Sequence, residues 1–152
     1  MTGDNPLIVG WREWVSLPEL GIRFIKAKID TGARSSALHT FSLERFTRGG
    51  ETWLRFGVHP KQQATRPERF AEARMIDERW VTDSGGHRER RPVILTPLAV
   101  GGLSWPIEVT LTDRDTMRFR LLIGRTAMQH GLIVNPGASY LTGRRKQDTR
   151  TR

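Results

Sequence analysis

Residues 26–38 read KAKIDTGARSSAL, and the segment changes character at Asp30. Up to Ile29 the chain is half apolar, with the spacing of a β-strand that borders a core. Asp30 follows directly, so its carboxylate is expected at the rim of a core rather than on a solvated loop. Gly32 comes two residues later and permits a tight turn that other residues resist. The segment therefore predicts a strand that ends in a turn holding a carboxylate in a fixed position.

The composition indicates a folded single domain. The chain has 152 residues, of which 37% are hydrophobic and 27% charged. It has no cysteine, which excludes disulfides and thiolate zinc sites. The first ten residues lack the basic start and apolar stretch of a signal peptide, and no apolar run approaches the about 20 residues of a membrane span. We expect a cytoplasmic protein with no membrane partner.

The charge is strongly positive. Lysine and arginine number 25 against 16 for aspartate and glutamate, a net charge of +9. Residues 143–152 are rich in arginine and are predicted to form a basic, disordered tail that follows a domain of residues 1–142. The remaining excess favours an anionic partner such as nucleic acid, an acidic peptide or a membrane surface. A role in solubility alone is the alternative.

Short alternating apolar segments, punctuated by 15 glycines and 8 prolines, are typical of β-strands joined by turns. A shift in the apolar phase at Phe24–Ile25 indicates a β-bulge. Residues 66–80 and 125–130 have helical composition. Strands are predicted over residues 10–17, 22–29, 52–58, 91–101, 106–112, 117–124 and 131–134. The fold predicted is mainly β, most simply a small closed barrel.

A second motif lies downstream, where residues 120–134 read RLLIGRTAMQHGLIV. Apolar residues precede Gly124, and a short helical turn and a strand follow. With its IDTGA (29–33) and LLIGRTAM (121–128) motifs, the chain resembles a subunit of the retropepsin-like aspartic proteases. In those subunits the apolar-Gly strand crosses beside the Asp-Thr-Gly loop and supports it. The resemblance implies a small closed retropepsin-like barrel with one short helix and a flap hairpin.

Longer segments extend the resemblance over roughly residues 8–142. They are RFIKAKIDTGARSSALH, RWVTDSGGHRERRPVILTPLAVGG, IEVTLTDRDTMRFRLLIGRTAM and LIVNPGASYL. In this order they resemble the RimB-like bacterial family long labelled ATP-dependent zinc proteases, whose members accompany ATP-grasp ligases that add glutamate tails to a ribosomal protein. The resemblance implies a peptidase that trims poly-glutamate tails and a functional link to such a ligase. Composition and spacing by themselves do not point to that substrate.

The chemistry implied requires two carboxylates about 3 Å apart that share a proton. One acts as a base towards water, and the other donates to the carbonyl oxygen. A subunit of this size supplies one Asp-Thr-Gly, so a homodimer with a twofold axis is expected. The predicted catalytic residues are Asp30, Thr31, which would bond across the dimer, and Gly32, which would let the backbone approach the carboxylates. An Asx-turn that merely ends a strand is the alternative for Asp30.

The segment TDSG (82–85) resembles a second such motif, but no second apolar-apolar-Gly segment supports it, and the chain is too short for two lobes. Residues 84–91, SGGHRERR, instead predict a hairpin tip in the position of a retropepsin flap. The planar guanidinium of arginine can donate two parallel hydrogen bonds to one carboxylate, so arginines on this hairpin are suited to bind glutamate side chains. The substrate-binding residues predicted on this hairpin are His87, Arg88, Arg90 and Arg91. A solvated basic hairpin is the alternative, and a structural role is a further alternative for Arg91.

Two more arginines flank the Asp-Thr-Gly loop. Retroviral enzymes usually pair an acidic residue after Asp-Thr-Gly-Ala with the arginine that follows the apolar-Gly motif. Here these places hold Arg34 and Arg125, so that ion pair cannot form. Either Arg125 finds another carboxylate, or both arginines bind an acidic substrate; both are included in the predicted substrate-binding set.

No metal or cofactor is expected. The chain has no His-Glu-x-x-His and no histidine pair at i, i+4, and its histidines at 39, 59, 87 and 130 are scattered. It also lacks the glycine-rich Lys-Ser/Thr loop of ATP-binding proteins, so the ATP of the family label is expected to belong to the ligase. Two rival functions remain open. One is a non-catalytic basic barrel that binds ribosomal RNA or the ribosome surface, using its charge and five tryptophans; the other is a general endopeptidase.

Overall fold

The structure is a computed structural model that describes residues 5–61, 65–83, 85–115 and 118–143. The predicted basic tail lies outside these ranges except for Gly143. Within the described residues the elements are β1 (Leu7–Gly10), β2 (Arg12–Leu17), the 3-10 helix η1 (Pro18–Leu20), β3 (Ile22–Asp30), β4 (Ser36–His39), β5 (Ser42–Arg48), β6 (Glu51–Val58), β7 (Arg69–Arg74), β8 (Asp77–Thr82), β9 (Arg88–Val100), β10 (Leu103–Thr112), β11 (Leu121–Gly124), α1 (Arg125–Met128) and β12 (Leu132–Asn135). None of the described helices is long and apolar enough to cross a membrane.

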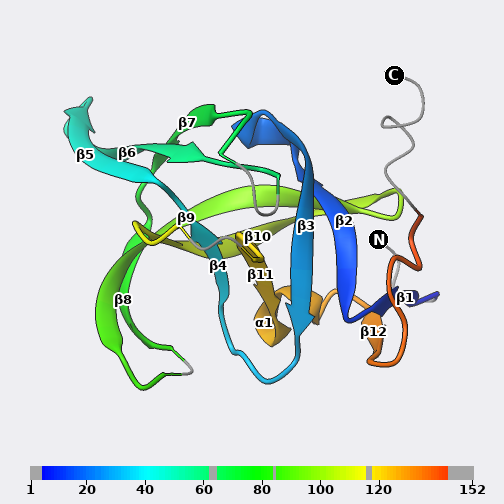
Figure 1. Cartoon of the computed structure of the whole chain (residues 1–152). Helices are drawn as coiled ribbons and strands as arrows, with labels where there is room; N and C mark the ends of the chain where they lie inside the picture. Colours follow the sequence, from blue (N-terminus) through cyan, green and yellow to red (C-terminus); the bar gives the residue numbers. More distant parts are fainter. Residues whose placement is uncertain (1–4, 62–64, 84, 116–117, 144–152) are drawn as a thin grey trace.

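A closed barrel occupies the centre of the molecule (Figure 1). Its strands follow the hydrogen-bonded order β10, β4, β11, β3, β2 and β9, and the pairing of β9 with β10 completes the circle. The prediction of a mainly β protein with a small closed barrel is therefore confirmed. The predicted bulge is also present, because Val15 of β2 pairs with Ile25 whereas Leu17 pairs with Ile22.

Strand β3 shows how the sequence divides between the core and the outer face. Ile25, Ala27 and Ile29 are buried inside the barrel. Each apolar side chain as large as isoleucine stabilises the fold by about 1.5–3 kcal/mol when it is fully buried. Because successive strand residues alternate in direction, Lys28 and Asp30 lie on the opposite, outer face. The pattern that builds the core therefore also presents Asp30 outside it.

The helix predicted over residues 66–80 is wrong. This segment forms β7 and β8, which pair with β6 and β9 respectively. In β7 the half-buried residues Ala71 and Ala73 alternate with the exposed Glu72 and Arg74, which is the period of a strand. Pairing with β6 and burial of the alanine face outweigh the helix-forming composition.

Two smaller sheets lie beside the barrel (Figure 1). Strands β5, β6 and β7 form one, and the buried face of β6 carries Leu54, Phe56 and Val58 into the common core. Strands β1 and β12 form a parallel pair, so segments near the two ends of the described chain lie side by side. The short strands β1, β4 and β5 were not predicted from the sequence. The strand predicted over 117–124 is observed only as β11, and residues 116–117 lie outside the described ranges.

Candidate active site

The Asp30 carboxylate is held by the turn that follows β3. The backbone N–H of Gly32 donates to Asp30 Oδ1 at 2.9 Å. The N–H of Ala33 donates to the Asp30 carbonyl at 3.2 Å, which closes the turn. Thr31 and Gly32 are exposed, and Asp30 is partly exposed. A fixed and accessible carboxylate therefore stands at the end of β3.

Strand β11 crosses directly behind this turn. It lies between β3 and β4, with Gly124 opposite Asp30 in the parallel register. The Gly124 N–H donates to Ser36 Oγ at 3.0 Å. A Cβ at Gly124 would lie 2.4 Å from the Ser35 carbonyl oxygen, so only glycine allows this approach.

Helix α1 then fastens the loop from the other side. The Arg125 N–H donates to the Ala33 carbonyl at 2.8 Å. Thr126 donates twice to the Arg34 carbonyl, from its N–H at 3.2 Å and from Oγ1 at 2.9 Å. The two motifs, distant in sequence, therefore form one rigid unit around Asp30.

Asp30 lines a pocket of about 530 Å3. One wall is the outer face of the barrel, and the opposite wall is the hairpin of β8 and β9. The barrel contributes Lys28, Asp30, Gly32, Ala33, Ser35, Ala37, His39, Thr110 and Leu122. The hairpin contributes Val81, Thr82, Asp83, Gly85 and Arg91, and Arg114 comes from the segment after β10. The carboxylate thus faces a space large enough for part of a peptide.

The hairpin tip is organised by Asp83. Its Oδ1 accepts from the N–H groups of Gly85 and His87, each at 2.9 Å. Its Oδ2 accepts from Arg114 Nη1 at 2.8 Å, which ties the tip to the barrel. The hairpin predicted around residues 84–91 is therefore present, with Ser84 itself outside the described residues.

Three of the residues predicted on this hairpin are not among those that line the pocket. His87, Arg88 and Arg90 are exposed and do not belong to its lining. The Arg88 guanidinium lies 4.5 Å from the centre of the Trp80 ring, and Arg90 Nη2 lies 3.4 Å from Glu78 Oε1. In this structure their positions match the alternative of a solvated basic hairpin.

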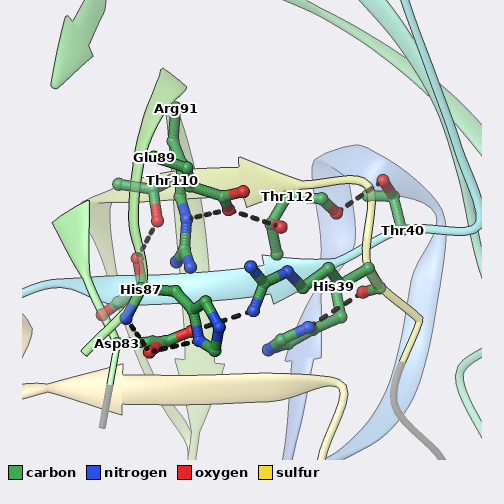
Figure 2. A network of polar contacts seen from close by, with 10 residues as sticks. His39, Thr40, Asp83, His87, Glu89, Arg91, Thr110 and Thr112 are labelled. Carbon is green, nitrogen blue, oxygen red and sulfur yellow. Dashed lines mark hydrogen bonds and ion pairs between the residues drawn. The ribbon is translucent and has the colours of Figure 1, made fainter. Parts of the chain in front are cut away.

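Arg91 is the predicted hairpin residue that does line the pocket. It is only 6% exposed, and its Nε donates to Glu89 Oε1 at 2.5 Å. Thr112 Oγ1 donates to the same oxygen at 2.8 Å (Figure 2). Arg91 therefore combines the structural role considered for it with a place in the pocket wall.

The two arginines beside the loop are exposed and lie outside the pocket lining. Arg125 Nη1 donates weakly to the carbonyl oxygens of Thr31 and Gly32, at 3.5 and 3.4 Å. Among the described residues no carboxylate lies within ion-pair distance of Arg34 or Arg125. The first alternative for Arg125, a substitute carboxylate within the chain, is therefore not observed in the part of the chain that the structure describes.

Three basic residues that were not in the predicted site set, Lys28, His39 and Arg114, line the pocket. Lys28 stands two residues before Asp30 on the same strand face, so alternation could have identified it. Arg114 and His39 meet through the tertiary fold, where His39 Nδ1 donates to the Arg114 carbonyl at 2.9 Å. Burial lowers the pKa of His39, and the charge of Arg91 lowers it further, against the opposing effect of this hydrogen bond. His39 is therefore neutral at neutral pH.

The other carboxylates near the pocket are held in the ionised form. The hydrogen bond from the His87 N–H, with those from Arg114 and the Gly85 N–H, lowers the pKa of Asp83. Burial alone would raise the pKa of Glu89, but hydrogen bonds from Thr112 and Arg91 outweigh it and lower the pKa. Neither group is suited to hold a proton beside Asp30 at neutral pH.

A zinc ion, which the label of the resembling family suggests, finds no fitting set of ligands. No three histidine, aspartate or glutamate side chains come together as a metal site within the described ranges. His59 Nδ1 is instead paired with Asp115 Oδ2 at 2.7 Å, and the His39 ring is bonded to a backbone carbonyl. No catalytic step is assigned to a metal.

The closed barrel, the Asp-Thr-Gly turn crossed by β11 and the hairpin across the pocket define the retropepsin-like class of aspartic peptidases. The chain belongs to the RimB-like family of retropepsin-like aspartic endopeptidases, whose family model matches residues 8–145. The family resemblance noted in the sequence is thereby confirmed.

Similar proteins extend this assignment. The chain is 40% identical over 140 residues to a probable alpha-L-glutamate ligase of Shewanella pealeana, covering 92% of this chain and 31% of that protein. A protein of the same name from Parasynechococcus marenigrum is 43% identical over 142 residues. The chain thus spans about a third of the length of these curated relatives. A crystal structure of Lpg0085 from Legionella pneumophila, of unknown function, matches with a TM-score of 0.72 at 28% identity, over 90% of this chain and 98% of that one.

Proposed function

We propose that the chain is a cytoplasmic aspartic-type peptidase that removes poly-glutamate tails from a ribosomal protein, as a homodimer in which each subunit supplies Asp30. The observation that carries this proposal is the placement of Asp30, fixed by its own turn and by β11, in the wall of a peptide-sized pocket. Membership of an aspartic endopeptidase family supports the reaction class.

In the proposed reaction two Asp30 carboxyl groups share one proton. The ionised carboxylate takes a proton from water as the water oxygen attacks the peptide carbonyl carbon, and the protonated carboxyl donates to the carbonyl oxygen. Collapse of the tetrahedral intermediate breaks the C–N bond, and the nitrogen leaves as an amine with a proton from the dyad. Gly32 leaves room beside the carboxylates, and Thr31 is proposed to bond across the dimer.

The electrostatics of the pocket favour a second subunit as the source of the second carboxyl. Asp83 and Glu89 have lowered pKa values and are engaged by cations and hydrogen bonds, so neither would share a proton with Asp30. The exposed turn at Thr31 and Gly32 leaves the Asp30 side of the loop accessible to another copy.

The cations around the loop support an acidic substrate. Lys28, Arg91 and Arg114 line the pocket, and Arg34 and Arg125 flank the Asp30 loop without carboxylate partners among the described residues. Glutamate side chains that enter such a site exchange water for arginine and lysine donors. The name of the larger relatives, glutamate ligase, supports a functional link between this domain and an enzyme that adds glutamate.

The test compares the wild type with Asp30→Asn on an oligoglutamate peptide. Asparagine keeps the shape of the side chain but cannot act as a base, so hydrolysis should fall below a few per cent of wild type while the fold and peptide binding persist. Glu19→Gln, an exposed carboxyl-to-amide change on η1, is the matched control and should retain full activity.

An oligoglutamine peptide of the same length separates the proposed specificity from general endopeptidase activity. The wild type should leave it uncut. Substantial turnover by Asp30→Asn would exclude the aspartic mechanism, and equal cleavage of both peptides would exclude the acidic specificity.

A further inference from the structure

We propose that the outer face of β2 and β3, next to the pocket, is an exosite that binds an acidic peptide several residues away from the cleaved bond. The exosite consists of Arg12, Trp14, Lys26 and Tyr140. This inference rests on the proposed function and specifies how a glutamate tail is recognised beyond the catalytic pocket.

The exosite is continuous with the pocket along β3. Lys26, Lys28 and Asp30 alternate onto one face of the strand, and Lys28 lines the pocket. Arg12 of β2 stands opposite Lys28. At about 3.3 Å per strand residue, Lys26 lies about 13 Å along the strand from Asp30. An extended peptide would cover that distance with about four residues.

The cations of the exosite are held in place by aromatic rings. The Arg12 guanidinium lies 4.7 Å from the centre of the Trp11 ring and 5.0 Å from that of Tyr140. Lys26 Nζ lies 5.1 Å from the Trp14 ring centre and 5.7 Å from that of Tyr140. These are distances of cation–π contacts. Arg12 Nε also donates to Ser139 Oγ at 3.1 Å.

These cations remain available for an anion. Over the described part of the chain, neither Arg12 nor Lys26 has a carboxylate within 4.0 Å. The solvent face of β5, β6 and β7 differs, since its arginines are neutralised across the strands. Its ion pairs are Arg48–Glu72 at 2.7 Å, Arg74–Glu51 at 3.3 Å and Arg55–Glu44 at 3.9 Å. Free charge on a rigid surface is the feature expected of a binding site.

Tyr140 adds an independent observation. It has φ of 57°, a left-handed conformation that is uncommon for a large residue and persists only where the surroundings hold it. The Tyr140 N–H donates to the Arg12 carbonyl at 3.0 Å. The buried Glu13 accepts from the N–H groups of Leu141 and Thr142 at 2.8 and 3.1 Å. The chain is thus fixed in an unfavourable conformation that holds the Tyr140 ring within cation–π distance of both Arg12 and Lys26.

The same geometry favours a peptide over RNA. The rings of Trp14 and Tyr140 stack on each other, with centres 6.2 Å apart and planes at 20°. Cations contact both rings, so their faces are not free to stack with bases as single-stranded nucleic acid requires. Glutamate carboxylates, in contrast, can bind through the charged groups of Arg12 and Lys26 alone and do not require a free ring face.

The experiment measures binding to Asp30→Asn protein, so that no substrate is consumed. Fluorescently labelled oligoglutamates of four and twelve residues are titrated by anisotropy. The longer peptide should bind more tightly, and Arg12→Ala and Lys26→Ala should each weaken its binding about three- to tenfold, as expected for a charged contact at a surface. Lys26→Arg keeps the positive charge and should therefore bind the longer peptide nearly as tightly as the protein with Lys26. Arg69→Ala removes an exposed cation on β7, where the side chain bonds only a backbone carbonyl, and should have no effect.

Three results would overturn the exosite. They are equal affinity for the two peptides, equal losses for both peptides in the exosite variants, and equal losses in Arg69→Ala. Stronger binding of a labelled single-stranded RNA with the same number of charges, weakened by the same variants, would replace the peptide with RNA as the occupant. Hydrolysis of the twelve-residue peptide by wild type tests the proposed function separately. Its absence, with length-dependent binding intact, would reject the peptidase and keep the exosite; circular dichroism of each variant controls for folding.

Discussion

Gly124 is a residue whose side chain, a single hydrogen, decides the geometry of the candidate site. It allows β11 to pass behind the Asp30 turn, and its N–H bonds to Ser36 Oγ. The added Cβ would meet backbone rather than a flexible side chain, so the neighbouring chain would have to move. That chain is the loop that holds Asp30.

We therefore expect Gly124→Ala to destabilise the protein by about 1–3 kcal/mol, the usual cost of overpacking, and to lower kcat on an oligoglutamate peptide. Urea unfolding and steady-state kinetics measure the two effects. Gly137→Ala is the matched control, because a Cβ there meets only Asn135 Oδ1 at 3.6 Å and φ is not positive. Similar behaviour of the two variants would show that the close approach at Gly124 does not constrain the site.

His39 is a second single residue with a predicted effect, because it makes the free energy of unfolding depend on pH. Burial lowers its pKa from the ordinary value of 6.5 in the folded state, whereas the unfolded chain retains that value. Between the two values the unfolded state binds more protons than the folded state, so stability decreases as the pH falls below about 6.5.

His39→Gln should remove this contribution and flatten the dependence of the free energy of unfolding on pH below about 6.5. Urea titrations at several pH values provide the measurement. An unchanged slope in His39→Gln would assign the pH dependence to other groups.

At the scale of elements, the β8–β9 hairpin is the part that bounds the pocket opposite Asp30. It is paired internally from Asp77–Val93 to Thr82–Arg88. Its tip is joined to the barrel side of the pocket by the Asp83–Arg114 ion pair. A partly exposed pair of this kind is weak by itself, so the tip is held by little beyond its own turn.

Arg114→Ala should increase the amide hydrogen exchange of residues 80–90 several-fold, because the tip opens more often when the pair is removed. Arg88→Ala provides the control, since Arg88 contacts Trp80 within the hairpin and has no ion-pair partner on the barrel among the described residues. Mass spectrometry of exchanged peptides reports both variants. If the two variants exchange alike, the Asp83–Arg114 pair does not restrain the tip.

At the scale of the whole molecule, the barrel presents a single Asp-Thr-Gly turn at an exposed surface. The proposed chemistry needs two such turns at a twofold axis, so the functional unit that we propose is larger than one chain. Activity is then a property of the assembly as well as of the fold.

Mixing wild type with an excess of Asp30→Asn subunits should therefore reduce activity per wild-type subunit, because mixed dimers contain only one competent carboxylate. The assay follows hydrolysis of oligoglutamate after time for subunit exchange, and analytical ultracentrifugation gives the oligomeric state. Glu19→Gln subunits in the same excess should not reduce activity. Full activity of a demonstrated monomer would contradict the dimeric mechanism.

The sequence by itself determined the local features of this protein. Alternation along residues 22–29 defined a strand with one face in a core, Asp30 and Gly32 defined its terminal turn, and the two motifs identified the family and the barrel. These inferences succeeded because they depend on neighbours in the chain. The helix predicted from the composition of residues 66–80 was wrong, because pairing with β6 and β9 decides the conformation of this segment.

Only the tertiary structure decided which side chains share the pocket. His87, Arg88 and Arg90, which the sequence places on the hairpin, do not line it, whereas Arg91 does. Lys28, His39 and Arg114 join Asp30 there, and Arg12, Lys26 and Tyr140 meet beside it. Residues from β2, β3, β4, β9, the segment after β10 and the segment after β12 become neighbours only when the barrel closes. Its register and twist set which faces converge, because these pairings join residues far apart in the chain and leave little trace in the order of amino acids within any one segment.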